Sequence, residues 1–449
     1  MLALGTAACG GGGVGSSVSP VSAPTIAAQP QSRVVPVGQA ATFTVVASGS
    51  GLTYAWRRDG VSISGATSAS YTTPPTSTVD DGAVFTVAVS NAAGSATSAA
   101  ATLRIEGFGP ASALKTARER HAAARLVDGR VLLCGGFAGA VLSSAELYDP
   151  ATGAFDWTGP LMAARQNHTA TLLPSGKVLV AGGEGGVGGG VILATAELYD
   201  PATGQFSPAG SMHTARTLHT ATRLADGRVL VAGGLAGRTP VATAELYDPA
   251  TNQFTPTAGD LGAARWWHAA ALLEDGKVLV AGGYGTTGGA LAGADVFDPA
   301  IGRFAPTGPM KAARYGHSAT ALPGGLVLVA GGYGTGYLDG AELYDPAAAS
   351  TTEAFAETGP MSGARYDHTA TALPGGKVLV AGGLGPGGVL ASAELYDPAT
   401  ALFAPSGALS VGRYLDTATL LSSGEVLVAG GWSLSDAGLA SADLYSGAP

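Results

Sequence analysis

The stretch RQNHTATLLPSGKVLVAGG, residues 165–183, decides the fold, because its pattern returns along most of the chain. An Arg is followed three residues later by a His, and fourteen residues after that by a Gly-Gly pair. The series is Arg118/His121/Gly135, Arg165/His168/Gly182, Arg216/His219/Gly233, Arg265/His268/Gly282, Arg314/His317/Gly331, Arg365/His368/Gly382 and Arg413/Asp416/Gly430. Successive copies are 47 to 51 residues apart, a period that predicts a repeat architecture.

Each copy divides into four short segments of strand-like sequence. In the copy quoted above these are residues 168–173, 177–183 and 196–200, and a fourth that begins at Phe206, with Gly-rich or Pro-rich turns between them. Four such strands form one sheet, and stacked sheets bury a common core. We therefore expect an all-β protein with a β-propeller.

The two ends of the repeat region complement each other. The seventh copy ends at Pro449 without a fourth strand, whereas Phe108, Leu114 and Arg118 repeat the spacing of Phe403, Leu409 and Arg413. We therefore predict that residues near 107–114 supply the missing strand. The expected unit is a seven-bladed propeller over residues 107–449, closed by its N-terminal strand. The alternative is that the six complete repeats alone form six blades.

The blade pattern resembles the kelch family, whose repeats contain Arg, Gly-His, a Gly-Gly pair and Glu-x-Tyr-Asp-Pro-x-Thr. In this chain the third strand reads Ala196-Glu-Leu-Tyr-Asp200 and is followed by Pro201-Ala-Thr-Gly204. The resemblance implies a propeller of the type found in the central domain of galactose oxidase.

Residues 24–106 have a different pattern of short alternating strands. Trp56 with Asp59-Gly60, Asp80-Asp81-Gly82, Phe85 and Asn91-Ala-Ala-Gly94 resemble an immunoglobulin-like domain without its disulfide. The resemblance implies a β-sandwich that acts as a spacer or adhesive module.

Residues 1–23 are expected to be a signal remnant, a lipidation site and a flexible spacer. Cys9 follows a small apolar segment and precedes Gly10–Gly13, which resembles the end of a bacterial lipoprotein signal. This implies an exported protein, anchored in the outer membrane or at the cell surface or periplasm. The alternative is a disordered N-terminus with an incidental Cys. The other cysteine, Cys134, takes a position that is Ala in the other copies and is predicted to be a small buried residue.

The composition excludes some classes of partner. The formal net charge is -9 and no Lys/Arg cluster occurs, so the chain has no positive surface that would attract nucleic acid. No cysteine-rich or other metal site is recognised, and no cofactor is expected. Membrane contact is predicted only through a lipid anchor.

The repeated charged residues are interpreted as a framework. Every copy has an acid in its third strand to match its Arg, namely Glu146, Glu197, Glu245, Asp295, Glu342, Glu394 and Asp443. An unpaired buried guanidinium is costly, so one ion pair per blade is expected. The six His are predicted to be hydrogen-bonded framework groups.

Function is sought where the copies differ. Aromatic and acidic residues gather after the Arg and after the Gly-Gly pair of the later copies. The candidate ligand-binding residues are Trp266, Trp267, Tyr284, Tyr315, Tyr333, Tyr366, Asp367, Tyr414, Asp416 and Trp432. Such a cluster suits stacking on sugar rings or peptide side chains. The alternative is that these aromatics only pack the channel mouth.

Two functions are compatible with this pattern. The preferred one is a non-catalytic binding or adhesion protein, whose propeller loops hold a carbohydrate or a protein. The alternative is a carbohydrate-active kelch enzyme, either an epimerase or mutarotase, with Asp416 as the single catalytic candidate, or a copper radical oxidase. Copper radical enzymes of the galactose-oxidase type have two Tyr, two His and a Cys cross-linked to a Tyr. No Tyr-His dipeptide occurs here, the nearest being Trp267-His268.

Overall fold

The computed structural model describes residues 21–186, 190–349, 351–434 and 438–447. Cys9 lies outside these residues. The described chain divides into two units, of which the first comprises the chain to Val35, Gln39–Thr76 and Asp80–Arg104. The second comprises Pro36–Gly38, Ser77–Val79 and the chain from Ile105. No helix among the described residues is long and apolar enough to cross a membrane.

The first unit contains short antiparallel strands around an aromatic core. Its elements are β1 (Thr25–Ala28), β2 (Arg33–Pro36), β3 (Thr42–Thr44), β4 (Val46–Ser48), β5 (Thr53–Arg58), β6 (Val61–Ser62), β7 (Ser70–Thr72), the 3-10 helix η1 (Thr78–Asp80), β8 (Val84–Asn91), β9 (Gly94–Thr97) and the start of β10 (Ala101–Pro110). Phe43, Trp56 and Phe85 are fully buried, and Phe43 stacks on Phe85 at 4.5 Å between ring centroids. An immunoglobulin-like sandwich is not evident in the pairs β1–β4 and β3–β7, so that resemblance stays a prediction.

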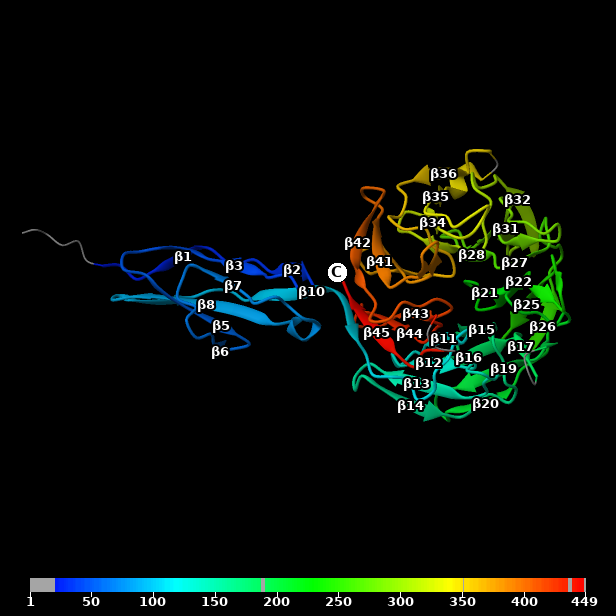
Figure 1. The fold of residues 1–449 in the computed structure, drawn as a ribbon, viewed down its shortest axis with the longest axis horizontal. Coiled ribbons are helices and arrows are strands. Elements are labelled where there is room, and N and C mark those ends of the chain that lie inside the picture. The colour runs from blue at the N-terminus through cyan, green and yellow to red at the C-terminus, as the bar shows by residue number, and fades with distance from the viewer. Residues whose placement is uncertain (1–20, 187–189, 350, 435–437, 448–449) are drawn as a thin grey trace, which may run out of the picture. The chain divides into compact units, whose positions relative to one another are not determined.

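The second unit is a β-propeller (Figure 1). Six of its sheets are self-contained, with four antiparallel strands each in chain order. The first three are β11 (Ala122–Arg125), β12 (Val131–Cys134), β13 (Ala145–Asp149) and β14 (Ala154–Thr158); β15 (Thr169–Leu172), β16 (Val178–Ala181), β19 (Ala196–Asp200) and β20 (Gln205–Pro208); and β21 (Thr220–Arg223), β22 (Val229–Ala232), β25 (Ala244–Asp248) and β26 (Gln253–Pro256).

The next three sheets have the same order. They are β28 (Ala269–Leu272), β29 (Val278–Ala281), β31 (Ala294–Asp298) and β32 (Arg303–Thr307); β33 (Ser318–Ala321), β34 (Val327–Ala330), β35 (Ala341–Tyr344) and β36 (Phe355–Thr358), with the 3-10 helix η2 (Pro346–Ala348) between the last two; and β37 (Thr369–Ala372), β38 (Val378–Ala381), β41 (Ser392–Asp397) and β42 (Leu402–Ala408). The predicted strand order within a repeat is confirmed.

The last repeat differs from the predicted seventh blade. Its strands β43 (Thr417–Leu420), β44 (Val426–Ala429) and β45 (Ala442–Ser446) pair in order, and residues 107–110 of β10 pair with β45. Because β10 is ten residues long and also pairs with β8, these strands belong to a nine-stranded sheet. The structure thus has six self-contained blades rather than seven equivalent ones. The predicted pairing of the Phe108 segment with the last repeat is present.

The first strand of each repeat lies innermost. β11, β15, β21, β28, β33, β37 and β43 contact one another in sequence, and β43 contacts β11 again. Buried clusters join neighbouring repeats: one, for example, combines Leu133 with Tyr148 and Leu427. The second strands, such as β16, are buried along their whole length, which explains their unbroken apolar sequence.

Short hairpins extend the loops at one face of the propeller. They are β17 (Glu184–Gly185) with β18 (Val191–Ile192), β23 (Leu235–Ala236) with β24 (Thr239–Pro240), and β39 (Leu384–Gly385) with β40 (Gly388–Val389). A further two-stranded pair joins β27 (Arg265–Trp266) to β30 (Tyr284–Gly285), with β28 and β29 between them in the chain. The segment after the Arg pairs with the segment after the Gly-Gly of the same repeat, as Tyr414 does with Trp432. The segments after the Arg and after the Gly-Gly pair therefore share a face of the propeller.

Candidate functional site

The charged framework matches its sequence prediction. In every repeat the Arg forms a buried ion pair with the third-strand acid, at 2.6 to 2.9 Å. Arg165, for example, donates to Glu197 and to the carbonyls of Gly182 and Thr195, while Glu197 also accepts from the backbone of Met162 and Ala163. These bonds satisfy the carboxylate and the two terminal nitrogens of the guanidinium, although Nε of Arg165 has no partner, so we assign the pair a structural role.

The His residues link neighbouring repeats. Their Nε2 atoms lie 2.9 to 3.2 Å from hydroxyl oxygens of the preceding repeat, in the pairs His121–Thr417, His219–Thr169, His268–Thr220 and His368–Ser318. Burial, reinforced by the neighbouring Arg, lowers the pKa of His121, His219, His268 and His368 to about 3. These four imidazoles are therefore neutral and match the predicted framework role, whereas neither ring nitrogen of His317 has a hydrogen-bond partner.

Cys134 replaces a missing hydroxyl in this series. The first-strand residue that would pair with His168 is Ala122, and Cys134 lies opposite it on the next strand. Its Sγ atom lies 3.7 Å from Nε2 of His168. Cys134 is fully buried, as predicted, and its sulfur serves the inter-repeat contact.

A ring of seven residues surrounds the propeller axis. The residue before each His, or before Asp416, has a left-handed backbone with φ between 50° and 59°: Arg120, Asn167, Leu218, Trp267, Gly316, Asp367 and Leu415. Gly316 adopts this conformation without strain, and Asn and Asp tolerate it, so the strain falls mainly on Arg120, Leu218, Trp267 and Leu415. Strained backbone of this kind is concentrated at functional sites.

Backbone hydrogen bonds connect five of the seven pairs of neighbouring residues in this ring. The N–H groups of Arg120, Asn167, Leu218, Gly316 and Asp367 donate to the carbonyl of the ring residue before them, at 2.8 to 3.2 Å. The corresponding bonds from Trp267 to Leu218 and from Leu415 to Asp367 are absent between these described residues. We call the contact between two neighbouring repeats a joint. Two joints of the ring therefore lack this backbone hydrogen bond.

A pocket of about 260 Å³ lies at this ring. It is lined by Arg120, Asn167, Leu218, Trp266, Trp267, Tyr366, Asp367, Tyr414 and Leu415. The lining combines aromatic and aliphatic side chains with a guanidinium, an amide and a carboxyl group. This combination suits a ligand that has both a flat apolar face and polar substituents.

The structure brings most of the predicted site residues together. Trp266, Trp267, Tyr366, Asp367 and Tyr414 line the pocket. The other aromatics continue from them by ring contacts: Tyr315 lies parallel to Trp267 at 5.7 Å, Tyr284 and Tyr333 contact Tyr315, and Trp432 meets Tyr414 edge-on at 5.4 Å. Asp416 does not line the pocket and lies buried beside it.

Sequence reasoning missed four pocket residues, Arg120, Asn167, Leu218 and Leu415. A signal was present, because they occupy the same column of the repeat as Trp267 and Asp367. Only the three-dimensional ring shows that residues at this position of the repeat line one common pocket.

Two carboxyl groups at the sixth and seventh repeats titrate unusually. Burial raises the pKa of Asp367 to about 7; Arg120 opposes this shift and Asp416 adds to it. Burial also raises the pKa of Asp416 to about 7, against the attraction of Arg413. Both groups thus change charge near neutral pH.

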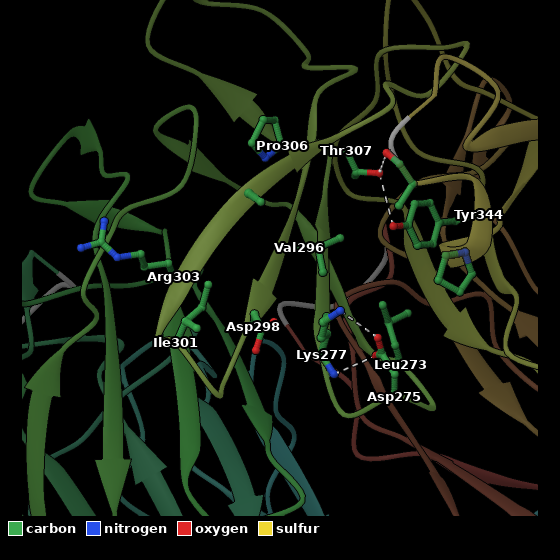
Figure 2. Close-up of a pocket in the computed structure, with 13 residues that line it drawn as sticks. Leu273, Asp275, Lys277, Val296, Asp298, Ile301, Arg303, Pro306, Thr307 and Tyr344 are labelled. Atoms are coloured by element: carbon green, nitrogen blue, oxygen red, sulfur yellow. Dashed lines mark hydrogen bonds and ion pairs between the residues drawn. The ribbon is translucent and has the colours of Figure 1, made fainter.

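A second pocket, of about 270 Å³, lies between the fourth and fifth repeats (Figure 2). In it Thr307 contacts the Tyr344 hydroxyl at 3.3 Å and donates to the carbonyl of Ala349 at 2.7 Å. Thr158 makes the same contacts to Tyr199 and Gly204 three repeats earlier. This groove is therefore part of the general packing of repeats, and the central pocket is the stronger candidate site.

Two segments, residues 168–213 and 216–259, match the model of the kelch motif. These segments are kelch motifs. A comparison with curated protein sequences finds no match.

Two solved structures share the fold. The chain is similar to a novel fungal alcohol oxidase with catalytic diversity among the AA5 family, in complex with copper, at 19% identity over 76% of each chain with a TM-score of 0.61. It is also similar to the structure of YjhT, at 14% identity over 66% of this chain and 99% of that one, with a TM-score of 0.52. At these identities the likeness concerns the fold.

The residues of this chain do not fit a copper centre. Among the described residues no three His, Cys, Asp or Glu side chains gather as a metal site. Five of the His side chains, namely His121, His168, His219, His268 and His368, face hydroxyl or thiol groups between repeats. Burial raises the pKa of the Cys134 thiol to about 12. We therefore derive no chemical step through copper.

Proposed function

We propose that the propeller is a non-catalytic binding module that takes a carbohydrate or protein ligand in the central pocket. The observation that supports this most directly is the composition of the pocket. Trp266 and Tyr366 line the pocket with aromatic side chains, while Arg120, Asn167 and Asp367 line it with polar groups. Aromatic platforms beside hydrogen-bonding groups are what a sugar ring or an amphipathic peptide side chain requires.

The rest of the proposal concerns how the module is presented. It includes export, lipid attachment through Cys9, an immunoglobulin-like stalk over residues 24–106, and a placement at the cell surface or in the periplasm. It also treats β10 with β43–β45 as a seventh blade, which the closed cycle of first-strand contacts supports. Palmitate labelling that is equal in wild type and Cys9→Ala would contradict the anchor.

An array of glycans and proteins, probed with the full chain, tests the binding role. Trp266→Ala and Tyr366→Ala should each weaken binding of any hit by about 30-fold, the effect of losing a central aromatic anchor. Trp157→Ala is the matched control, because Trp157 is a 56% exposed aromatic on β14 and does not line the pocket. Unchanged binding by both pocket variants would remove the proposal.

The second candidate is a carbohydrate-active enzyme, such as an epimerase or mutarotase. It is favoured by the carboxyl groups of Asp367 and Asp416, whose pKa values of about 7 suit proton transfer at neutral pH. Polarimetry of reducing sugars would detect mutarotation. The enzymatic proposal requires an activity that Asp367→Asn abolishes, and no activity in wild type would exclude a mutarotase.

A further inference from the structure

The joint between the sixth and seventh repeats lacks two connections that the other joints use. The first is the His link, because Asp416 stands where six repeats have His. In the other joints the imidazole occupies the space beside the first Gly of the preceding repeat. Its Cε1 atom lies 2.5 to 2.8 Å from the point that a Cβ atom on that Gly would take. At Gly382 the nearest atoms to that position belong instead to Arg413 and Leu409.

The second missing connection is the ring hydrogen bond between Leu415 and Asp367. Two other joints each lack one of the two connections. The bond from Trp267 to Leu218 is absent, but His268 still contacts Thr220 at 2.9 Å. His317 has no hydroxyl partner, but Gly316 still donates to the carbonyl of Trp267. Among the described residues, only the joint at Asp416 lacks both.

The Asp416 carboxyl is only weakly compensated, by the positive charge of Arg413 and by its own backbone N–H. Both of its oxygens are buried and have no hydrogen-bond partner. The charged groups that act on it are Arg413 of its own segment and Asp443 of β45, and it interacts with Asp367 of the sixth repeat. One cation against two acids does not neutralise an ionised Asp416, so the charged form is stable only if water reaches it.

This joint divides the wall of the central pocket. Tyr366 and Asp367 belong to its sixth-repeat side, and Tyr414 and Leu415 to its seventh-repeat side. Any widening of the joint separates these two pairs. Widening would therefore reduce the contacts available to a ligand that touches both sides.

We propose that the joint is proton-operated: it is closed while Asp416 is protonated and opens when Asp416 releases its proton to water, so that ligand binding in the central pocket weakens as the pH rises through neutrality. The regulation of binding rests on the proposed function, whereas the opening itself does not. A closed joint needs a neutral group in the buried position, and six repeats meet that need with a neutral imidazole.

The variant Asp416→His tests this directly, because it restores the residue of the other repeats. The new imidazole would face the hydroxyl of Thr369, in the arrangement of His219 and Thr169. In the full chain, the test measures amide hydrogen exchange of residues 413–420 at pH 6 and at pH 8. After correction for the intrinsic base-catalysed rise in exchange rate, the wild-type rate should increase about tenfold further, because each opening releases one proton. Asp416→His should not show this excess.

Two further variants keep the test decisive. Asp416→Asn is uncharged at every pH and should also lack the excess exchange, even if Asp416→His fails to fold. Asp156→His makes the same chemical change at an exposed position of β14 and should behave as wild type. Equal pH profiles for wild type, Asp416→His and Asp416→Asn would overturn the proposal.

The ligand arm separates this proposal from the proposed function. Array hits bound at pH 6 should bind about tenfold more weakly at pH 8 in wild type, and Asp416→Asn should reduce that difference. Hits whose pH dependence is the same in both proteins would overturn the regulatory role. A wild-type chain that binds nothing at either pH, yet shows the exchange difference, would remove the proposed function and leave the proton-operated joint.

Discussion

Glu197→Gln is the sharpest test of the framework reading of the repeated Arg and acid. The side chains of Arg165 and Glu197 are 0% and 3% exposed and lie 2.6 Å apart. Gln has the same shape but no charge, so the guanidinium would stay buried without its counter-ion. Removing one partner of a buried pair costs about 3–5 kcal/mol.

This cost converts into a measurable shift in melting temperature. Unfolding entropy of about 2.1 cal/mol/K per residue gives about 0.7 kcal/mol/K for a unit of this length, if the propeller melts cooperatively. The expected decrease in Tm is therefore about 4–7 °C by differential scanning calorimetry. Ligand binding should be unchanged at temperatures where the variant is folded.

Asp128→Asn is the matched control. Arg130 and Asp128 form a pair at 2.7 Å, but their side chains are 33% and 46% exposed. Exposed pairs contribute about 0–1 kcal/mol, which corresponds to a Tm decrease of about 1 °C. Equal shifts for the two variants would refute the framework reading, as would lost binding with an unchanged Tm in Glu197→Gln.

Three other predictions concern the links between repeats. The pKa of buried residues such as His121 is lowered to about 3, so below about pH 6.5 the unfolded chain takes up protons that the folded chain does not. The stability of the fold should therefore fall as the pH drops from there toward 3. A Tm that stays constant from pH 6.5 to 4 would contradict this. Cys134, with its pKa raised to about 12, should resist a thiol reagent at pH 8 in folded Cys9→Ala protein and react once denatured; rapid labelling of the folded form would show that the thiol is accessible. Ala269→Thr should give Nε2 of His317 the hydroxyl it lacks and raise stability by about 0.5–1.5 kcal/mol in urea unfolding, whereas a loss of stability would show that the methyl group does not fit.

Much of the propeller could be predicted from local sequence. The alternation of strands and Gly-rich turns depends on residues close in the chain, and the spacing of Phe108 to Arg118 identified the strand that pairs with β45. The Arg–acid pairs were predictable by counting, because a buried guanidinium needs a counter-ion in every repeat. The count of seven equivalent blades was wrong, because β10 continues into a second set of pairings that no repeat spacing reveals.

The sequence by itself therefore determined the repeat unit, its strands and its charged framework, all of which follow from short-range patterns and charge balance. Only the tertiary structure decided which side chains share the central pocket. Arg120, Asn167, Asp367 and Leu415 are separated by about one or more repeats in the chain and meet only when the ring closes. The open joint at Asp416 was likewise visible only in three dimensions, because it depends on what surrounds the carboxyl group: its buried oxygens, the missing ring bond to Asp367 and the contacts at Gly382.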